Sequence, residues 1–466
     1  MATVSIDQRP LYKVLPIGQQ VIFAVSENTI VATKYKVKFV AEVRVSSSSG
    51  INPNVDTDLI GTFKTTPNNA GVGIFDLRPI LETFVKPDNE PSSDANATYK
   101  GIPESIVTFP IHLVDMYSLS DNSVKYFAIR FLVEYSAAPT GAVVTPTHEV
   151  DSTEYTMFNG VLQYSDVLTK SLYAHNYGYN LENFELTDSD SQFLSNAPTT
   201  QYARLTDYGT FPFLNFVPNS TDKVTSMTLK YYDSSDVQLG VDYVLNTAGN
   251  GGVAAVGDSN TMLNYFGGFP ANLRADGTTT FAALVAAGTI QGGYYTIQDG
   301  GGDSVLYRIN ILCPNQRGYE PIRLTWLNQW GTWDYYTFNM KSTKAVKTKR
   351  ISYTQMEGTW NESTFKIADY KGGKKNFKVN STERIKINTD FVTEAEGVWF
   401  EELINSNEVY IVNGFSADTA NTITNKYIEP VTLRTSSYTR KTIANDRLMQ
   451  YKFEIEKTRT KRTQSV

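Results

Sequence analysis

Several stretches of this chain alternate apolar and polar residues with a period of two. Between residues 36 and 45, one side of such a strand carries Val37, Phe39, Ala41, Val43 and Val45. The same alternation returns over 127–135 and 449–456. This is the repeat of a β-strand with one buried face and one wet face. A chain built from such stretches must pair them in sheets and bury one face of each sheet.

The composition agrees with a β-rich chain. The 466 residues include 29 Tyr and 24 Phe but only 19% charged residues, and aromatic side chains suit a pleated, half-buried surface. Clusters of Ser, Asn, Gly and Pro at 46–54, 66–73 and 86–98 indicate turns between the first strands. A chain of this length exceeds what one hydrophobic core supports, which predicts about two to four domains.

We predict an all-β-dominated fold of several β-sandwiches, with a smaller mixed α+β domain at the C-terminal end. We expect residues 1–145 to form the first sandwich and residues 146–340 to form a second β-rich domain. The second domain carries a Gly/Ala-rich insertion at 249–293, which is too long for an ordinary loop and predicts an arm, a tip or a small subdomain. Residues 341–466 form the third domain, which contains the clearest helical pattern, at 394–403.

Shorter signals predict local structure. Asn159-Gly160 is typical of a tight hairpin turn. Asp76 and Pro79 predict a short helix within 76–85, because Asp caps helix starts and Pro is tolerated in the first turn. His112 falls in a short alternating stretch and is expected on a strand.

A further hairpin is predicted where aromatic residues crowd around the turn segment 328–331. The residues concerned are Trp326, Trp330, Trp333 and Tyr335. One interpretation is a hydrophobic core beneath a rigid hairpin, whose turn is favoured by an Asn and a Gly. The other interpretation is an exposed contact ridge, because Trp and Tyr anchor protein interfaces. On that second interpretation the four aromatic residues are interface candidates.

Charge is distributed unevenly along the chain. Residues 341–466 hold 22 Lys/Arg against 15 Asp/Glu, a net charge of +7, whereas the remaining residues hold 20 against 33, a net charge of −13. The basic interface candidates are Lys344, Lys347, Lys349, Arg350, Lys374 and Lys375. Interleaved aromatic residues would let such a segment bind single-stranded nucleic acid. We favour complementary charge between neighbouring protein subunits instead, since the basic residues are diluted among strands and acids.

Motifs for catalysis are absent from the sequence. The histidines His112, His148 and His175 show neither H-x-x-x-H nor H-E-x-x-H spacing, and there is no G-x-S-x-G elbow and no phosphate-binding lysine loop. The single cysteine, Cys313, excludes an internal disulfide. A pair of glycosidase acids would leave no local signature and is a minor alternative. We therefore expect no enzyme activity and no cofactor.

Signals for metal binding and membrane insertion are weak. Asp299 and Asp303 flank three glycines and could ligate calcium, but a solvated turn is the favoured interpretation. Apolar runs are too short to span a bilayer. The opening MATVSIDQRP lacks the basic-then-apolar plan of a signal peptide. We expect folding in the cytoplasm and no insertion into a membrane.

Two stretches carry a resemblance to known proteins. Within 319–338 a pattern of the form R-x-x-W-L-N-x-x-G-x-x-D-x-x-x-F is met by Arg323, Trp326, Leu327, Asn328, Gly331, Asp334 and Phe338. This segment resembles one found in structural proteins of marine and Bacteroidetes-infecting tailed phages. Residues 399–411, followed by 429–431 and 450–451, resemble the C-terminal part of the same proteins, and 10–25 and 193–198 are similar as well.

The resemblance implies a virion structural protein, and most specifically a ring or hub subunit of the tail or baseplate. Such a subunit acts by assembling with copies of itself and with other phage structural proteins. The implied location is the virion, after assembly in the host cytoplasm. One alternative is a head-side decoration, collar or head-fibre protein. The other is a receptor- or glycan-binding tail protein.

Overall fold

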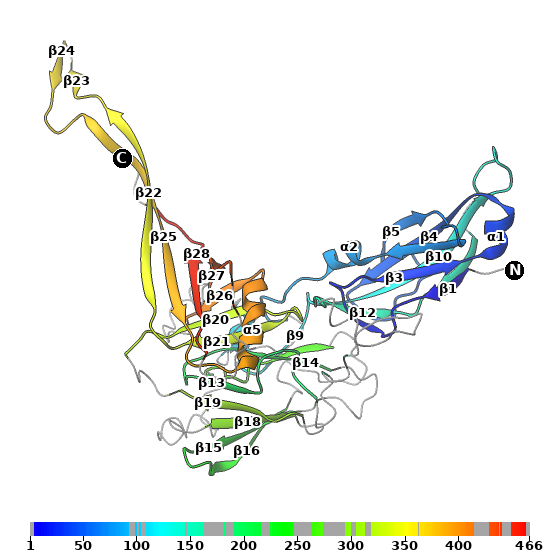
Figure 1. The fold of residues 1–466 in the computed structure, drawn as a ribbon, viewed down its shortest axis with the longest axis horizontal. Coiled ribbons are helices and arrows are strands. Elements are labelled where there is room, and N and C mark those ends of the chain that lie inside the picture. Colours follow the sequence, from blue (N-terminus) through cyan, green and yellow to red (C-terminus); the bar gives the residue numbers. More distant parts are fainter. Residues whose placement is uncertain are drawn as a thin grey trace. The chain divides into compact units, whose positions relative to one another are not determined.

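The computed structural model describes residues 4–92, 98–99, 102–103, 109–144, 147–162, 181, 184, 191–215, 224, 226–246, 262–273, 294–299, 304–312, 318–361, 363–413, 428–437, 439 and 449–462. Strands dominate these residues and helices are few, which confirms the predicted all-β-dominated, multi-domain fold (Figure 1). The described residues fall into two compact units. The first contains the residues up to 312 together with 327–334, and the second contains 318–326 and the remaining residues from 335 onward.

Two facing sheets form a β-sandwich in the first unit. One has the strand order β1 (Ser5–Gln8), β3 (Ile22–Ser26), β6 (Val72–Asp76). The other has the order β2 (Val14–Pro16), β12 (Tyr155–Phe158), β10 (Val124–Ser136), β4 (Tyr35–Ser46), β5 (Leu59–Thr65), and β11 (Thr147–Asp151) also pairs with β10. The central strands β4 and β10 pair antiparallel from Ser46 opposite Tyr126 to Tyr35 opposite Ser136. Because β11 and β12 join this sheet, the sandwich includes residues beyond 145.

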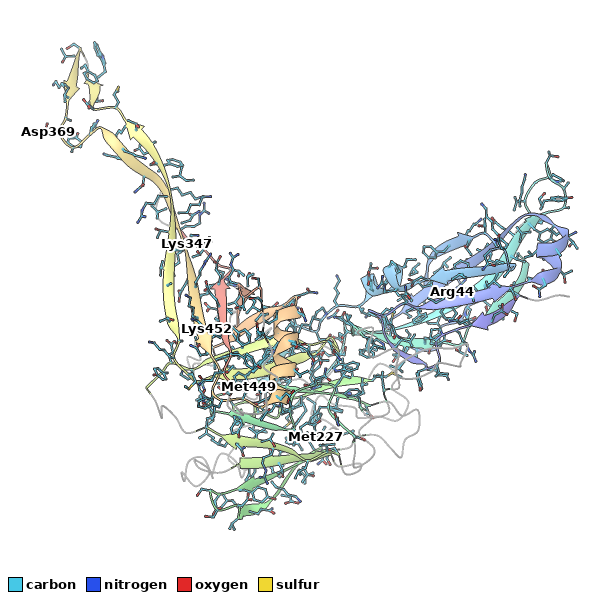
Figure 2. The ribbon with its side chains drawn as sticks, viewed as in Figure 1. Arg44, Met227, Lys347, Asp369, Met449 and Lys452 are labelled. Carbon is cyan, nitrogen blue, oxygen red and sulfur yellow. The ribbon has the colours of Figure 1, made fainter. Side chains whose placement is uncertain are left out.

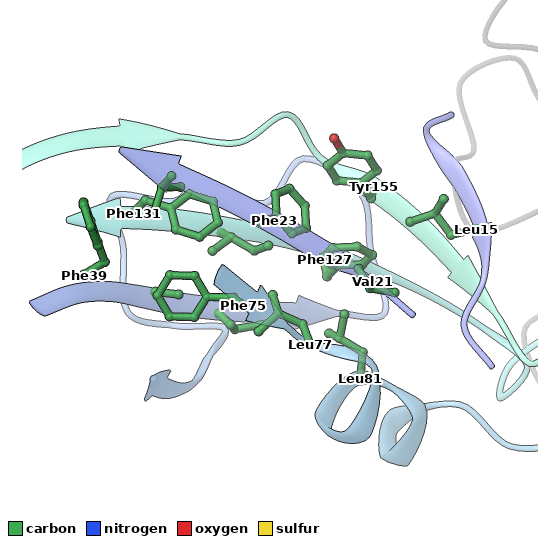
Figure 3. Close-up of a cluster of buried hydrophobic side chains, with 14 of the residues drawn as sticks. Leu15, Val21, Phe23, Phe39, Phe75, Leu77, Leu81, Phe127, Phe131 and Tyr155 are labelled. Carbon is green, nitrogen blue, oxygen red and sulfur yellow. The ribbon is translucent and has the colours of Figure 1, made fainter. Parts of the chain in front are cut away.

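Aromatic side chains from both sheets meet in the core of this sandwich (Figure 3). Phe23 of β3 and Phe75 of β6 each contact Phe131 of β10, with ring centroids 5.5 and 5.7 Å apart. Tyr155 of β12 stacks on Phe127 at 5.2 Å. Burial of each large apolar side chain contributes about 1.5–3 kcal/mol. The alternation over 127–135 therefore has the expected outcome: the odd-numbered residues of β10 from 127 to 133 face this core.

Short helical segments connect these strands. They are α1 (Asn28–Thr33), α2 (Arg78–Leu81), η1 (Glu82–Phe84) and η2 (Ile111–Leu113). The Asp76 carboxylate accepts hydrogen bonds from the backbone N–H groups of Arg78 at 3.1 Å and Val21 at 3.3 Å, and Pro79 lies in the first turn of α2. The short helix predicted within 76–85 is thus confirmed as α2 and η1, but its N-cap residue is Leu77 and not Asp76.

His112 lies in η2, so its predicted strand position is wrong. All residues from Ile111 to Val114 are buried, and the apparent alternation therefore does not separate a wet face from a buried one. The imidazole instead packs edge-on against the indole of Trp333, with ring centroids 4.9 Å apart. His112 is accordingly a residue of the core.

The hairpin predicted at Asn159-Gly160 is wrong as well. Both edges of β12 are occupied, by β10 on one side and by the parallel strand β2 on the other. The chain after β12 continues instead toward a later segment, where the backbone N–H of Val161 donates to the carbonyl oxygen of Gln329 at 2.6 Å. Long-range pairing has overridden the local turn preference of the dipeptide.

Further sheets complete the first unit. A five-stranded sheet has the order β13 (Thr200–Ala203), β19 (Tyr307–Ile311), β18 (Tyr294–Asp299), β15 (Ser226–Tyr232), β16 (Gln238–Asn246). A three-stranded sheet has the order β14 (Phe211–Leu214), β17 (Leu263–Phe266), β9 (Tyr117–Leu119). The short strands β7 (Thr98–Tyr99) and β8 (Ile102–Pro103) form a separate pair.

The predicted Gly/Ala-rich insertion at 249–293 is described at residues 262–273 only. There, β17 is the central strand of the three-stranded sheet, and every residue of β17 is buried. For this part, the expectation of an exposed arm or tip is wrong, because Leu263–Phe266 supply core packing between two partner strands. The other residues of the insertion lie outside the described part of the chain.

The second unit contains one helix and most of an eight-stranded sheet, of which residues 327 and 333–334 belong to the first unit. The sheet has the order β21 (Trp333–Phe338), β20 (Ile322–Leu327), β26 (Val409–Val412), β27 (Ile428–Leu433), β28 (Lys452–Lys457), β25 (Gly373–Asn388), β22 (Thr343–Gln355), and β29 (Lys461–Arg462) also pairs with β25. A separate small hairpin joins β23 (Gly358–Asn361) to β24 (Thr364–Ile367). The strand predicted from the alternation over 449–456 is confirmed as β28.

The helix of the second unit, α5 (Glu394–Asn405), confirms the helical pattern at 394–403. Its start is fixed by a capping box: the Thr393 hydroxyl accepts from the N–H of Glu396 at 3.2 Å, and the Glu396 carboxylate accepts from the N–H of Thr393 at 2.7 Å. Trp399, Phe400 and Leu403 are buried on its inner side. The smaller unit is therefore mixed α+β, as predicted.

Candidate assembly surface

The four aromatic interface candidates belong to the hairpin formed by β20 and β21. The exposed fractions of Trp326, Trp330, Trp333 and Tyr335 are 0, 2, 0 and 4%. In the second unit, Trp326 packs on Trp399 of α5 with ring centroids 4.8 Å apart. A contact ridge would need accessible side chains. Burial therefore supports the core interpretation of these residues.

Polar bonds fix the turn of this tryptophan hairpin. The side-chain oxygen of Asn328 accepts from the N–H groups of Trp330 at 3.0 Å and Thr332 at 3.1 Å. Gly331 has a φ of 72°, and a Cβ atom at this position would lie 1.7 Å from the carbonyl oxygen of Asn159. Only glycine can adopt this positive φ without strain and fit here without a clash. The tryptophan hairpin is thus a rigid part of the scaffold.

The six basic candidates lie together on one long hairpin of the second unit, formed by β22 and β25; Lys347 is labelled in Figure 2. They are Lys344, Lys347, Lys349, Arg350, Lys374 and Lys375. The two strands pair antiparallel from Thr343 opposite Lys386 to Gln355 opposite Gly373. Of β22, every residue except Gln355 is exposed.

The outer part of this hairpin has no third strand among the described residues. β28 pairs with β25 only over 384–388, and β29 pairs with it only over 380–381. From Arg350 opposite Val379 outward, the two strands pair with each other alone. We name residues 350–379 the arm; it ends in the hairpin of β23 and β24 (Figure 1). An isolated two-stranded ribbon is marginally stable in water.

The register of β22 and β25 sorts their side chains onto two faces. One face carries Lys347, Lys349, Ile351, Tyr353, Lys375 and Lys378 and no carboxylate. We name it the lysine face. Its four lysines pair with no carboxylate among the described residues. Lys344, near the start of β22, differs: its ammonium group lies 2.6 Å from the carboxylate of Glu320.

Apolar side chains are exposed at the end of the arm. Trp360 of β23 lies directly opposite Phe365 of β24, and Ile367 shares their face. The exposed fractions of these three residues, which we name the apolar tip, are 68, 47 and 72%. Met356 and Tyr370, beside the tip in sequence, are also exposed. Clustered exposed apolar side chains of this kind indicate an interaction site.

The lysines of this hairpin were predicted from the sequence, but the apolar tip was not. β23 and β24 have four residues each, too few for a period-two pattern to stand out. The available signal was the pairing of Trp360 with Phe365 across a short polar turn, which places two aromatic residues at the end of a basic hairpin. Their exposure, however, depends on the lack of a third strand there.

The net charge of this hairpin is opposite in sign to the net charge of residues 145–313. Residues 343–388 hold 11 Lys/Arg and 4 Asp/Glu, a net charge of +7. Residues 145–313 hold 6 Lys/Arg and 17 Asp/Glu, a net charge of −11. Charge asymmetry on this scale steers the association of complementary surfaces.

The described residues show no arrangement for metal chemistry, since no three His, Cys, Asp or Glu side chains among them gather closely enough to hold an ion. Asp299 ends β18, while Asp303, His175 and Cys313 lie outside the described residues. In the described parts of the chain, no helix has the length and apolar character needed to cross a membrane.

One buried carboxyl group stands out in the first unit. Burial raises the pKa of Asp88, although the Ser120 hydroxyl and the backbone N–H of Asn122 each donate to it at 2.7 Å. The backbone carbonyl oxygen of Asp88 accepts from the indole N–H of Trp333 at 2.8 Å. Asp88 is therefore tied into the support of the tryptophan hairpin.

Comparison with known proteins assigns no family to the chain. No family model and no curated protein matches it. Among solved structures, it is similar to the native conformation of E. coli alpha-2-macroglobulin at 8% identity and a TM-score of 0.18. The alignment covers 82% of this chain, which spans about a fifth (21%) of that protein. A TM-score this low supports no conclusion on fold or function.

Proposed function

We propose that this protein is a structural subunit of a tailed-phage virion, most specifically a ring or hub subunit of the tail or baseplate. It acts by assembling with copies of itself and with other phage structural proteins. The observation that carries the assembly role is the arm, an unsupported two-stranded ribbon that ends in the apolar tip and holds the outer part of the lysine face, including Lys375 and Lys378. The phage assignment rests on the sequence resemblance of 319–338 and 399–411.

The energetics of the arm favour an assembled state. Each large apolar side chain that moves from water into an interface contributes about 1.5–3 kcal/mol, and the apolar tip offers Trp360, Phe365 and Ile367 for such burial. This gain offsets part of the entropic cost of association, about 4–15 kcal/mol. The lysine face adds steering toward an acidic partner, which raises the association rate.

A receptor- or glycan-binding tail protein is the second candidate. The observation that favours it is the exposure of two aromatic side chains, Trp360 and Tyr370, near the end of a projecting element. The two candidates differ in what the arm binds. If the protein is a receptor- or glycan-binding tail protein, the purified chain should adhere to host cells or glycans. If it is a ring or hub subunit, the purified chain should adhere to its own copies.

The test compares the full chain with a variant in which the arm is replaced by Asn-Gly. Lys349 and Asn380 are directly opposite in the ladder, so a two-residue turn can join them. Mass photometry should show a closed symmetric oligomer for the full chain and a monomer for the variant. Circular dichroism should show that the variant loses only the strand signal of the arm and unfolds as cooperatively as the full chain. A monomeric full chain, or an oligomer that survives loss of the arm, would contradict the proposal.

A further inference from the structure

We infer that the arm of one copy docks on the acidic region of a second copy, with β22 lying along the outer edge of β16. This inference rests on the proposed function and deepens it by naming the partner surface.

The lysine face requires an anionic partner. Lys347, Lys349, Lys375 and Lys378 project from one side of two paired strands, and that side carries no carboxylate. Like charges at this spacing repel one another, and an acidic surface laid against them removes the repulsion. Residues 145–313 of the same chain supply the complement, with a net charge of −11.

The apolar residues of the arm select a protein over a nucleic acid. Single strands bind through phosphate contacts and through bases that stack on aromatic rings. Ile351, Ile367 and Met356 are exposed on the arm and have no ring to stack on. Covering them takes apolar side chains, which another protein surface provides. A second copy is a partner whose sequence supplies charge of the opposite sign.

The accepting surface is the outer edge of the five-stranded sheet. Among the described residues, β16 pairs with β15 alone, so its other edge is open. Val244 of β16 is 49% exposed, and Val237, in the turn just before β16, is 58% exposed. The carboxylates of Asp242 in β16 and Asp236 in the preceding turn are also exposed, and they lie 3.9 Å from Lys230 and 4.0 Å from Arg308. Exposed valines beside exposed aspartates complement the mixed apolar and basic character of the arm.

The lysines also determine which contacts form. Lysine on an edge strand prevents pairing with a like edge, so β22 of one copy does not pair with β22 of another. The contact is then heterologous, between two different surfaces of the same chain. Contacts of this type generate rings when the rotation closes, which agrees with the ring subunit proposed above.

Reciprocal charge changes test the contact. The arm variant is Lys375→Glu with Lys378→Glu. The body variant is Asp236→Asn with Asp242→Lys; Asn is chosen because Asp236 has a φ of 67°, which Asn tolerates. Each variant alone should associate about tenfold more weakly than the unmodified chain, because exposed charge pairs contribute up to about 1 kcal/mol each. The matched control, Lys452→Glu in β28, should associate like the unmodified chain.

Mixing the two variants gives the decisive result. In the mixture, the unmodified arm of the body variant meets the unmodified acidic edge of the arm variant. The acidic arm of the arm variant meets the basic edge of the body variant. Sedimentation velocity should therefore show that association returns. Each variant should keep the circular dichroism spectrum of the unmodified chain. If the mixture does not regain association, the inference is overturned.

Two other outcomes separate this inference from the proposed function. If the unmodified chain associates through its arm but the body variant associates equally well, another surface accepts the arm and only this inference fails. If the unmodified chain stays monomeric, the proposed self-assembly fails with it. Salt-sensitive binding of a single-stranded oligonucleotide to the arm, with no copy-to-copy contact, would overturn the inference in favour of nucleic acid.

Discussion

The chain contains two hairpins rich in aromatic residues, and they have opposite environments. The tryptophan hairpin of β20 and β21 buries Trp326, Trp330 and Trp333 almost completely. The hairpin of β23 and β24 leaves Trp360 and Phe365 exposed. The residue types are the same in both. What differs is the presence of other elements against the hairpin, such as α5 beside Trp326.

This difference teaches that an aromatic hairpin can serve as a scaffold or as a contact surface, and that local sequence does not decide between them. A fully packed indole stabilises its own unit. An exposed indole on a two-stranded ribbon stabilises only a complex. Substitutions in the two hairpins should therefore separate stability from association.

The largest effect is expected for Trp333→Ala. Trp333 is fully buried, contacts His112 and donates its indole N–H to the carbonyl oxygen of Asp88. Its loss should lower the free energy of unfolding by about 3–5 kcal/mol, because truncation leaves a cavity. Urea-induced unfolding measures this. A loss below about 0.5 kcal/mol, the range of surface substitutions, would show that the tryptophan hairpin is not part of the core.

A smaller, pH-dependent effect is expected at Asp88. Burial raises the pKa of Asp88, so the folded protein holds this proton more tightly than the unfolded chain does. The resulting stabilisation is complete at pH values below the ordinary aspartate range and is lost as the pH rises through the elevated value. In Asp88→Asn this dependence disappears, so the stability of the unmodified chain relative to the variant should decline with rising pH. A difference that stays constant from acid to neutral pH would refute this assignment.

The smallest effect on stability is expected for Trp360→Ala. The side chain is 68% exposed, so the free energy of unfolding should change by less than about 0.5 kcal/mol. Association measured by mass photometry should nevertheless weaken, because the apolar tip loses its largest side chain. Equal association of the variant and the unmodified chain would remove Trp360 from the interface.

Local patterns were sufficient to predict several elements. The alternation over 127–135 predicted β10, and the helical pattern at 394–403 predicted α5. Each of these signals is contained within one element. Asn159-Gly160 failed for the opposite reason, because partners distant in sequence occupied both edges of β12.

The candidate surface was predictable only in part. The sequence shows a basic segment, but Lys375 and Lys378 are three residues apart and in a regular strand would point to opposite faces. A bulge in β25 between the partners of Ile351 and Ser352 brings them onto one face. The burial of Trp326 and Trp333 likewise depends on Trp399 and Asp88, which lie far away in sequence.

The exposure of Trp360 has a practical consequence for spectroscopy. The other four tryptophans, Trp326, Trp330, Trp333 and Trp399, are buried. A water-soluble quencher therefore reaches the indole of Trp360 first, and the red side of the emission spectrum belongs mainly to this residue. The protein thus carries an intrinsic, label-free fluorophore at the end of its arm, and coverage of the arm by any partner should shift its emission toward the blue.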